Sequence, residues 1–511
     1  MSRRFKTADY AATLEVTVRL GDCVPPEHLA RFVVDAIAQM DLSRIYARYG
    51  TRGGEAYAPE ILVGLLFYGY ATGLFSTRQI ERATYESIPF RYIAGDRHPD
   101  HDTIAHFRKA FLGELKELFV QLLVLAHLAG VVVLGPISGD GTKVHADASK
   151  SKAVSYQRLG AIEAQLQAEV EELFALSEQA EQEALPTGLV VGDEIARREA
   201  QLARLAQAKA VLEARAAERL AQEQAAYAAK LAQRAEKERT SGQRPGGRPP
   251  SPPTAGPRAT DQYNFTDPES RIMKNPTDAG FEQDYNVQLA VDQDSLLIVG
   301  TALSNHPNDT QEAEALLAAI PPAVGTPAAA ALDTGYFGPA TLEACARRGI
   351  EPYIATGRDP HHPSWRERFA PLPAPPASDA SPQVQMAYKL KTAAGKAIYG
   401  ARKCTVEPVL GIIKEVLGFR QFSLRGLEAA AGEWCLICLA FNLKRLHTLL
   451  HGDARLLSGL DDRGRDAAPR CVLCAVAGWL WRLLVALGRP AVAPPAAPLN
   501  PVLGPFSPTG C

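Results

Sequence analysis

Three acidic residues stand in sequence contexts that suit metal-assisted chemistry on a phosphodiester. Asp140 follows an apolar run in ISGDGTKV, Asp333 ends a second apolar run in AAALDTGYFG, and Glu407 lies among basic residues in RKCTVEPVLGIIK. Three such carboxylates can hold two divalent cations about 3.5–4 Å apart, one on the attacking oxygen and one on the leaving oxygen. We therefore expect these three acids to be both metal ligands and catalytic residues.

Each of the three acids also has a simpler explanation. Asp140 precedes Gly141, and Asp-Gly is a common turn pair. Asp333 could cap the helix that follows it, and a glutamate in a first helical turn often only compensates the helix dipole. Asp147 is a further acid that could replace or support Asp140. The strand-like residues after Gly141 favour a strand over a turn at Asp140.

Glu407 is distinguished by its neighbours. Pro408 follows it and fits best in a first helical turn, so we expect Glu407 at the head of an amphipathic helix. Lys414, seven residues later, returns to nearly the same helical face. An acid among bases is what a site for phosphate-rich DNA requires. Between 386 and 420 only Glu407 and Glu415 are acidic, against Lys389, Lys391, Lys396, Arg402, Lys403, Lys414 and Arg420.

Alternating segments around these acids predict a mixed sheet flanked by helices. A strand leads into Asp140, and a long insertion interrupts the chain after it. A hairpin of two strands, a helix, a strand ending at Asp333, another helix and a further strand then follow. A Pro-rich loop is expected at 358–386. The expected strands after the insertion cover residues 285–291, 296–303, 327–332 and 350–355.

Residues 25–130 have the pattern of short helices joined by tight turns. Ser76 and Gln79 form a capping-box pattern, and Asp100 or Asp102 is expected to cap a later helix. We expect the basic residues of these helices to face outward, where they either contact DNA phosphates or are ordinary solvated charges. These residues are Arg78, Arg82, Arg91, Arg108 and Lys109.

Residues 154–240 repeat apolar residues at helical spacing, with a break at 185–188. This pattern predicts an antiparallel helical hairpin of coiled-coil type. Dimer contacts and guidance of DNA are both open as its role. Residues 241–260 are rich in Pro and Gly, so we expect a flexible or extended linker whose three arginines meet no acid.

The bulk composition restricts the class of protein. With 55 Lys and Arg against 57 Asp and Glu, the net charge is −2, so affinity for nucleic acid has to come from local basic patches. The N-terminus lacks the apolar core of a secretion signal. The apolar stretches at 119–137 and 471–488 contain polar residues, so we expect buried segments and no membrane contact.

Eight cysteines include two Cys-x2-Cys pairs, Cys435 with Cys438 and Cys471 with Cys474. Two such pairs can indicate a zinc site. Both pairs lie in apolar stretches without the turns of a zinc knuckle, so we expect small core residues on helix faces. The other cysteines are scattered, as in proteins of the reducing cytoplasm.

Together these segments resemble the DDE-type transposases of bacterial insertion sequences, which have a ribonuclease-H-like catalytic domain. The resemblance runs over nearly the whole chain, through TIAHFRKAF, DGTKVHADASK, GFEQDYNVQLAVD, ALDTGYFGPATLEAC, YGARKCTVEPVLGIIK and EWCLICLAFNLKRL. The family carries a Tyr-x2-Arg-x3-Glu-x6-Lys pattern around the third acid. Tyr399, Glu407 and Lys414 match it, but four residues separate Arg402 from Glu407. Lys403 has the expected spacing, which leaves open whether Arg402 or Lys403 faces the phosphate.

The resemblance implies a divalent-metal-dependent enzyme that cleaves DNA at the ends of an insertion sequence and transfers the strands into target DNA. Asp140, Asp333 and Glu407 would ligate two Mg2+ ions, for which Mn2+ can substitute, and catalysis would rest on positioning and charge neutralisation. Double-stranded DNA, a homodimer on that DNA and a cytoplasmic, nucleoid-associated location are also implied. The residues that would grip the DNA are Tyr399, Arg402, Lys403 and Lys414.

The expected fold class is therefore α/β: a ribonuclease-H-like mixed sheet flanked by helices, interrupted by a long helical hairpin, with an all-α N-terminal domain. Two rival functions are a catalytically inactive DNA-binding protein of transposase descent and a nuclease that cuts without joining. The presence of all three acids in context favours the active enzyme. The expected divisions are a DNA-binding domain at 1–130, catalytic segments at 131–150 and 261–450, the hairpin at 151–240, the linker at 241–260, and a C-terminal helix with a disordered Pro-rich tail at 451–511.

Overall fold

The computed structural model describes residues 19–452 apart from 51–54, 180–187, 245, 275–279, 358–363 and 369–370. The chain divides into two compact units, Met1–His447 and Thr448–Cys511. Within the described residues, no helix is long and apolar enough to cross a bilayer. The expected helix at 471–488, the second cysteine pair and the C-terminal tail lie outside the described residues.

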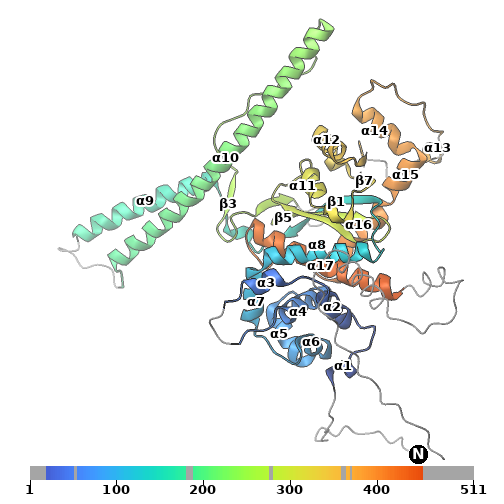
Figure 1. The fold of residues 1–511 in the computed structure, drawn as a ribbon. Coiled ribbons are helices and arrows are strands. Elements are labelled where there is room, and N and C mark those ends of the chain that lie inside the picture. The colour runs from blue at the N-terminus through green and yellow to red at the C-terminus, as the bar shows by residue number, and fades with distance from the viewer. Residues whose placement is uncertain are drawn as a thin grey trace, which may run out of the picture. The chain divides into compact units, whose positions relative to one another are not determined.

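Helices occupy most of residues 20–128, as predicted (Figure 1). α4 is their centre, because its apolar residues extend around the whole helix and are buried from Leu62 to Ala71. α2, α5, α6 and α7 pack against it. The helices are α1 (Leu20–Cys23), α2 (Leu29–Ala38), α3 (Ser43–Ala47), α4 (Pro59–Ala71), α5 (Thr77–Glu86), α6 (Ile88–Ala94), α7 (His101–Ala110) and α8 (Leu112–Leu128).

The local capping predictions for these helices have different outcomes. Asp100 caps α7, since its side chain accepts a hydrogen bond of 2.7 Å from the backbone N–H of Thr103. Ser76 precedes α5 but makes no side-chain cap, so the predicted capping box is wrong. The backbone carbonyl of Ser76 instead accepts from the N–H of Ile80 and begins the helix without side-chain help.

A mixed sheet is built around β1 as its central strand. β5 pairs with β1 in antiparallel register from Ile137 to His145, while β7 and β8 continue the sheet in parallel on the other side. β4 and β6 pair with successive parts of the free edge of β5. This topology confirms the predicted ribonuclease-H-like α/β class. The strands are β1 (Pro136–His145), β4 (Arg271–Lys274), β5 (Phe281–Asp292), β6 (Ile298–Ser304), β7 (Ala329–Leu332) and β8 (Glu351–Ile354).

Alternate residues of β1 point to opposite faces of the sheet, and each face is covered by a helix. A Cβ on Gly139 would lie 3.3 Å from Leu316 of α11, and 2.3 Å from Leu332, so only glycine fits there. On the other face, Ser138 is hydrogen-bonded through its Oγ to Thr405 of α16. The helices of this region are α11 (Glu312–Ala318), α12 (Pro339–Arg348), α13 (Trp365–Arg368), α14 (Pro382–Lys391), α15 (Ala393–Gly400), α16 (Arg402–Gly411) and α17 (Leu427–Gly452).

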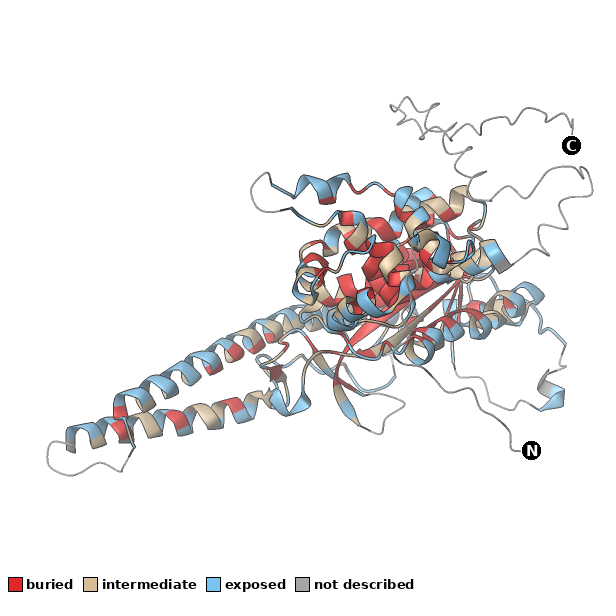
Figure 2. Cartoon of the chain, turned by 90° about the horizontal axis from the view of Figure 1, so that it is seen from below, coloured by how far each residue is buried: buried red, intermediate tan, exposed pale blue. Residues whose placement is uncertain are grey.

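The insertion after β1 is a pair of helices, α9 (Tyr156–Gln179) and α10 (Val191–Ser241), that run side by side (Figures 1 and 2). Apolar residues line their contact, with Leu159 and Leu166 facing Leu205 and Leu212. Two short strands, β2 (Ala153–Ser155) and β3 (Gln262–Asn264), pair where the insertion begins and ends. The predicted helical hairpin is therefore present.

The Pro/Gly-rich segment after α10 returns along that helix. Arg258 forms an ion pair with Glu223 of α10 at 2.8 Å, and Arg219 of α10 donates to the carbonyl of Gly256. Arg244 lies 3.9 Å from Glu238 but is almost fully exposed. The prediction that the arginines of this segment meet no acid is thus wrong, because α10 supplies glutamates that the linear sequence does not place beside them.

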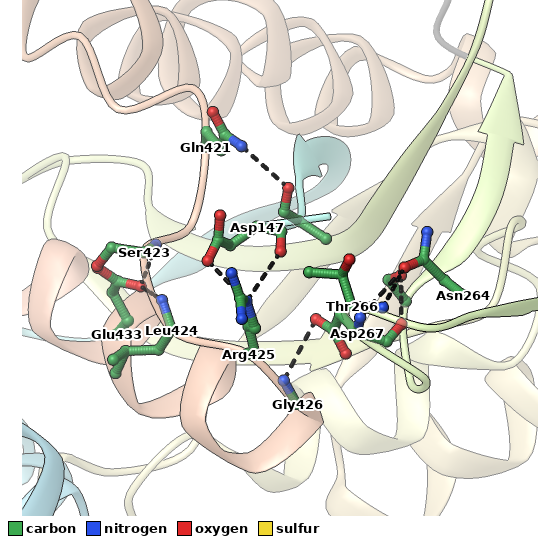
Figure 3. A network of polar contacts seen from close by, with 12 residues as sticks. Asp147, Asn264, Thr266, Asp267, Gln421, Ser423, Leu424, Arg425, Gly426 and Glu433 are labelled. Atoms are coloured by element: carbon green, nitrogen blue, oxygen red, sulfur yellow. Dashed lines mark hydrogen bonds and ion pairs between the residues drawn. The ribbon is translucent and has the colours of Figure 1, made fainter. Parts of the chain in front are cut away.

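A polar network joins the end of the insertion to the segment before α17 (Figure 3). Asp267 accepts hydrogen bonds from the hydroxyl of Tyr285 and from the N–H of Gly426. Arg425 forms an ion pair with Asp147 at 2.8 Å, just beyond the end of β1. These contacts hold both ends of the insertion against one short segment of backbone.

Cys435 and Cys438 are buried one helical turn apart on α17, and neither forms a disulfide. Burial raises the pKa of the Cys435 thiol to about 12, so it stays protonated. This confirms the prediction of core cysteines for the first pair.

A buried ion pair connects the N-terminal helices to α17. The guanidinium of Arg108 on α7 lies 3.5 Å from the carboxylate of Glu433, with the two side chains 8% and 0% exposed. The hydroxyl of Tyr70 on α4 accepts from Arg108 and donates to Glu433. The N–H groups of Ser423 and Leu424 also donate to Glu433. The prediction that Arg108 faces outward is wrong, because this carboxylate, distant in sequence, compensates its charge.

Replacing Glu433 by alanine should lower the free energy of unfolding by about 3–5 kcal/mol, because Arg108 would keep a buried and uncompensated charge. Glu428→Ala is the matched control, since Glu428 is an exposed acid of the same helix and should cost less than about 0.5 kcal/mol. Urea unfolding of the full chain measures both. Equal losses for the two variants would contradict the role of the buried pair.

Candidate active site

Asp140 lies inside β1 at the centre of the sheet. It pairs with Leu289 of β5, so the alternative of an Asp-Gly turn is wrong. Alternation along the strand puts its side chain on the face of Ser138, which α16 covers through Thr405. The side chain is 17% exposed.

Asp333 follows the last residue of β7, the parallel neighbour of β1. Ser138 pairs with Ala331, and two further residues along each strand bring Asp140 level with Asp333. The carboxylate of Asp333 also accepts from the N–H of Gly335 at 2.8 Å and caps the turn Thr334–Tyr336. Asp333 therefore has both the strand-end position and the capping bond that were considered as alternatives.

Glu407 lies within α16, not at its head. α15 ends at Gly400 and α16 begins at Arg402, with Ala401 between them in helical conformation. Pro408 is consequently inside the helix, and the N–H that it lacks would have bonded to Cys404, which is exposed and can be hydrated. The predicted helix start is wrong because the preceding helix continues into this one.

Arg402 links the acids. Its guanidinium lies 2.8 Å from the carboxylate of Asp140 and 3.9 Å from that of Glu407, and its side chain is only 13% exposed. Lys403, the neighbour with the spacing of the family pattern, is exposed. Arg402 thus points at the acids, and Lys403 points to solvent.

The carboxylates of the site disfavour their own ionisation. Burial raises the pKa of Asp140 to about 6, and the negative charges of Asp333 and Glu407 add to this rise, whereas Arg402 opposes it. Burial also raises the pKa of Asp333, and the carboxylate of Asp309 contributes. The site therefore holds more negative charge than its own cation balances.

Lys414 contacts β1 just beyond Asp140, and Tyr399 contacts Arg402. The ammonium of Lys414, in the π-helical turn Ile412–Val416, donates to the hydroxyl of Thr142 at 2.6 Å and to the carbonyl of Lys143 at 2.7 Å. Burial lowers the pKa of Lys414. The pKa of Arg402, which burial lowers, is raised overall by Asp140 and by the charge and hydrogen bond of Tyr399.

A second polar group beside the acids was missed from the sequence. Asp309 accepts hydrogen bonds of 2.8 Å from the side-chain amides of Asn286 and Gln288, both buried on β5. Gln288 in turn accepts from the hydroxyl of Tyr336. The signal was available, because Asn286 and Gln288 are two residues apart and are the only amide or charged side chains of the expected strand 285–291, where unpaired polar groups would be costly.

The oxygen ligands of this site suit a hard divalent cation such as Mg2+. A cation would also offset the burial, and the smaller repulsion from Asp333 and Glu407, that raise the pKa of Asp140. As they stand, however, no three Asp, Glu, His or Cys side chains among the described residues converge closely enough to hold a metal ion. The guanidinium of Arg402 contacts the carboxylates of both Asp140 and Glu407.

Asp147, the alternative acid, lies apart from this group in its ion pair with Arg425. The structure thus brings together Asp140, Asp333 and Arg402 with Glu407 and Lys414 at their margin. Lys403 is not part of this contact group.

Two family models match the chain. The Transposase domain (DUF772) matches residues 18–110, and the Transposase DDE domain matches residues 261–443. Searches of curated proteins and of solved structures give no match. Residues 111–260, which lie between the two matches, hold β1 with Asp140 and the helical insertion. The sheet topology places that unmatched strand at the centre of the matched domain.

The raised pKa of Asp140 predicts a pH-dependent stability in metal-free solution. Between the unfolded value of 3.8 and the folded value of about 6 the folded state binds more protons, so stability falls as pH rises. Relative to Asp140→Asn, the wild-type protein should lose about 3 kcal/mol from about pH 4 to about pH 7. Urea unfolding with a chelator present measures this, and parallel pH curves for the two proteins would contradict it.

Proposed function

We propose that this chain, which carries the two domains of a DDE-type insertion-sequence transposase, cleaves DNA at the ends of its element and transfers the strands into target DNA. The observation that supports this most is the placing of Asp140 and Asp333 at one level on adjacent parallel strands, with the helix of Glu407 covering them. Such carboxylates at neighbouring strand positions are what metal-assisted phosphoryl transfer requires.

Asp140, Asp333 and Glu407 would hold two Mg2+ ions, with Mn2+ as a substitute. Bound ions of this kind lower the pKa of a water and neutralise charge on phosphate oxygens. Asp140 and Asp333 are partly buried, which would limit the water around their carboxylates. The carboxylate of Glu407 is 48% exposed, so DNA and metal would reach it from solvent.

Basic and hydroxyl groups beside the acids would position the DNA backbone. Arg402 and Lys414 lie next to the acids and along β1, and their charges would pair with phosphates. Tyr399, which is hydrogen-bonded to Arg402, would add a hydroxyl donor, and the exposed Lys403 would add charge at the rim. These contacts hold a phosphodiester in place, which is the main contribution of a protein to this chemistry.

The N-terminal helices would provide further contacts to double-stranded DNA. Arg78 and Lys109 are exposed there, whereas Arg82 and Arg91 pair with neighbouring acids and Arg108 is buried. Two ends must be brought together for transfer, so we propose a homodimer on DNA. The corresponding site of action is the bacterial cytoplasm, at the nucleoid.

The acids can be tested with the full chain, Mg2+ and a duplex carrying the ends of its element. Asp140→Asn, Asp333→Asn and Glu407→Gln should each reduce cleavage and strand transfer at least ~100-fold, because each removes a negatively charged ligand of the proposed metal ions. DNA binding measured by gel shift should persist. Gel analysis of products separates cleavage from joining, and so separates a transposase from a nuclease.

Asp147→Asn is the matched control, because it changes the same functional group seven residues along the chain, at an ion pair outside the site. It should keep full activity. Undiminished activity in one of the three active-site variants would remove that residue from the site. Lack of activity in the wild-type protein, with DNA binding intact, would favour a binding protein that has lost catalysis.

A further inference from the structure

The candidate active site already contains a cation that belongs to the chain. Arg402 places one guanidinium between Asp140, at 2.8 Å, and Glu407, at 3.9 Å, and its positive charge also acts on Asp333. Three carboxylates carry a charge of −3 and one guanidinium returns +1, so the group as it stands has a net charge of −2. A guanidinium can neutralise only part of what a divalent ion could.

We infer that Arg402 is a displaceable internal counter-ion, which holds the place of the divalent cation while DNA is absent and moves to a DNA phosphate when metal binds. This inference rests on the proposed function, because it assigns a second position to a residue of the same site. It makes Arg402 a positioning residue that couples metal binding to DNA binding.

The two contacts of Arg402 differ in a way that permits such a movement. The contact with Asp140 is short and mostly buried, but the contact with Glu407 is long and its carboxylate is 48% exposed. A loose, exposed ion pair contributes little, roughly 0–1 kcal/mol. Arg402 also hydrogen-bonds to Tyr399, one turn earlier in the sequence, which is not one of the acids. The guanidinium has five N–H donors, so it can keep its hydrogen bond to Tyr399 while its contacts with the carboxylates change.

Arg402 lies at the first residue of α16, next to the junction with α15. Its long side chain reaches back to β1 from there, while Lys403 beside it is turned to solvent. The long side chain gives the guanidinium a route away from the acids by a change of its own torsions. Phosphate suits the released group, because guanidinium and phosphate form strong paired hydrogen bonds.

The consequence is thermodynamic coupling between two ligands. Arg402 competes with metal for the acids in the free protein, and a phosphate that binds Arg402 removes this competition. DNA should then tighten metal binding, and metal should tighten DNA binding by the same factor. The free protein would load little metal and would not become reactive before DNA is in place.

The test is Mn2+ binding to the full chain, measured by electron paramagnetic resonance of the free ion, without DNA and with a short duplex of mixed sequence. Arg402→Gln should bind Mn2+ roughly 10-fold more tightly than the wild-type protein when DNA is absent. Addition of the duplex should tighten Mn2+ binding in the wild-type protein and have a much smaller effect in Arg402→Gln.

Two further variants show whether a change in Mn2+ affinity is specific to the guanidinium of Arg402. Lys403→Gln removes the same charge from the adjacent, exposed position, and it should change Mn2+ affinity in the DNA-free protein far less than Arg402→Gln. Arg402→Lys retains the charge with a side chain that cannot bridge two acids, and should give an intermediate affinity. It also serves if Arg402→Gln fails to fold, which a thermal melt in chelator shows.

The possible failures are distinguishable. Equal Mn2+ affinity in the wild-type protein and in both Arg402 variants would overturn the inference and leave the proposed function standing. An equal rise for Lys403→Gln would also overturn it, because the effect would then be general electrostatics. Absence of Mn2+ binding in every protein, with and without DNA, would overturn the metal-dependent function itself.

Discussion

The register between β1 and β5 is the constraint on which the site depends. Nine consecutive residue pairs fix it, from Ile137 with Asp292 to His145 with Asp284. A slip of one residue would turn every side chain of β1 to the opposite face. Asp140 would then point at α11, away from α16, and would lose Arg402. The glycine at 139 reinforces this register, since a side chain there would collide with Leu332.

The molecule buries a carboxylate beside an arginine in two places, with different results. Glu433 is fully enclosed and accepts hydrogen bonds from two backbone N–H groups and from Tyr70, so that it is satisfied on all sides. Asp140 has one backbone N–H, from Gly141, and one guanidinium. The arrangement at Glu433 is a structural contact that holds α17 against α4 and α7. The arrangement at Asp140 leaves a carboxylate with fewer partners, and its burial raises its pKa.

Local periodicity was sufficient to predict the strands, the N-terminal helices and the helical hairpin, because these depend on neighbours two to four residues away. It also placed Asp333 at the end of its strand. Predictions failed where a distant residue decided the outcome. Arg108 was expected at the surface, but its burial depends on Glu433, more than 300 residues later.

In the candidate active site, too, local sequence predicted some features and contacts between distant residues decided the others. The family pattern identified Glu407 as the third acid and Arg402 as its neighbour, but it did not show that Arg402 would touch Asp140 across 262 positions. Pro408 suggested a helix start by a sound local rule, which the continuation from α15 into α16 overrode. Asp309 lies in no recognisable sequence motif. Its hydrogen bonds to Asn286 and Gln288 form only when the fold brings β5 beside it.

The place of the helical insertion has a consequence for how the chain is made. β1 leaves the ribosome 139 positions ahead of its partner residues on β5, as the contact between His145 and Asp284 shows. At about 5–20 residues per second, roughly 7–28 seconds of translation separate the two strands. α9 and α10 need only each other, and helices form in microseconds once their residues are available. The hairpin can therefore fold before β5 has been synthesised. Once β2 and β3 pair at its base, the chain that follows is close to β1, and β5 can pair with β1 as soon as it is translated.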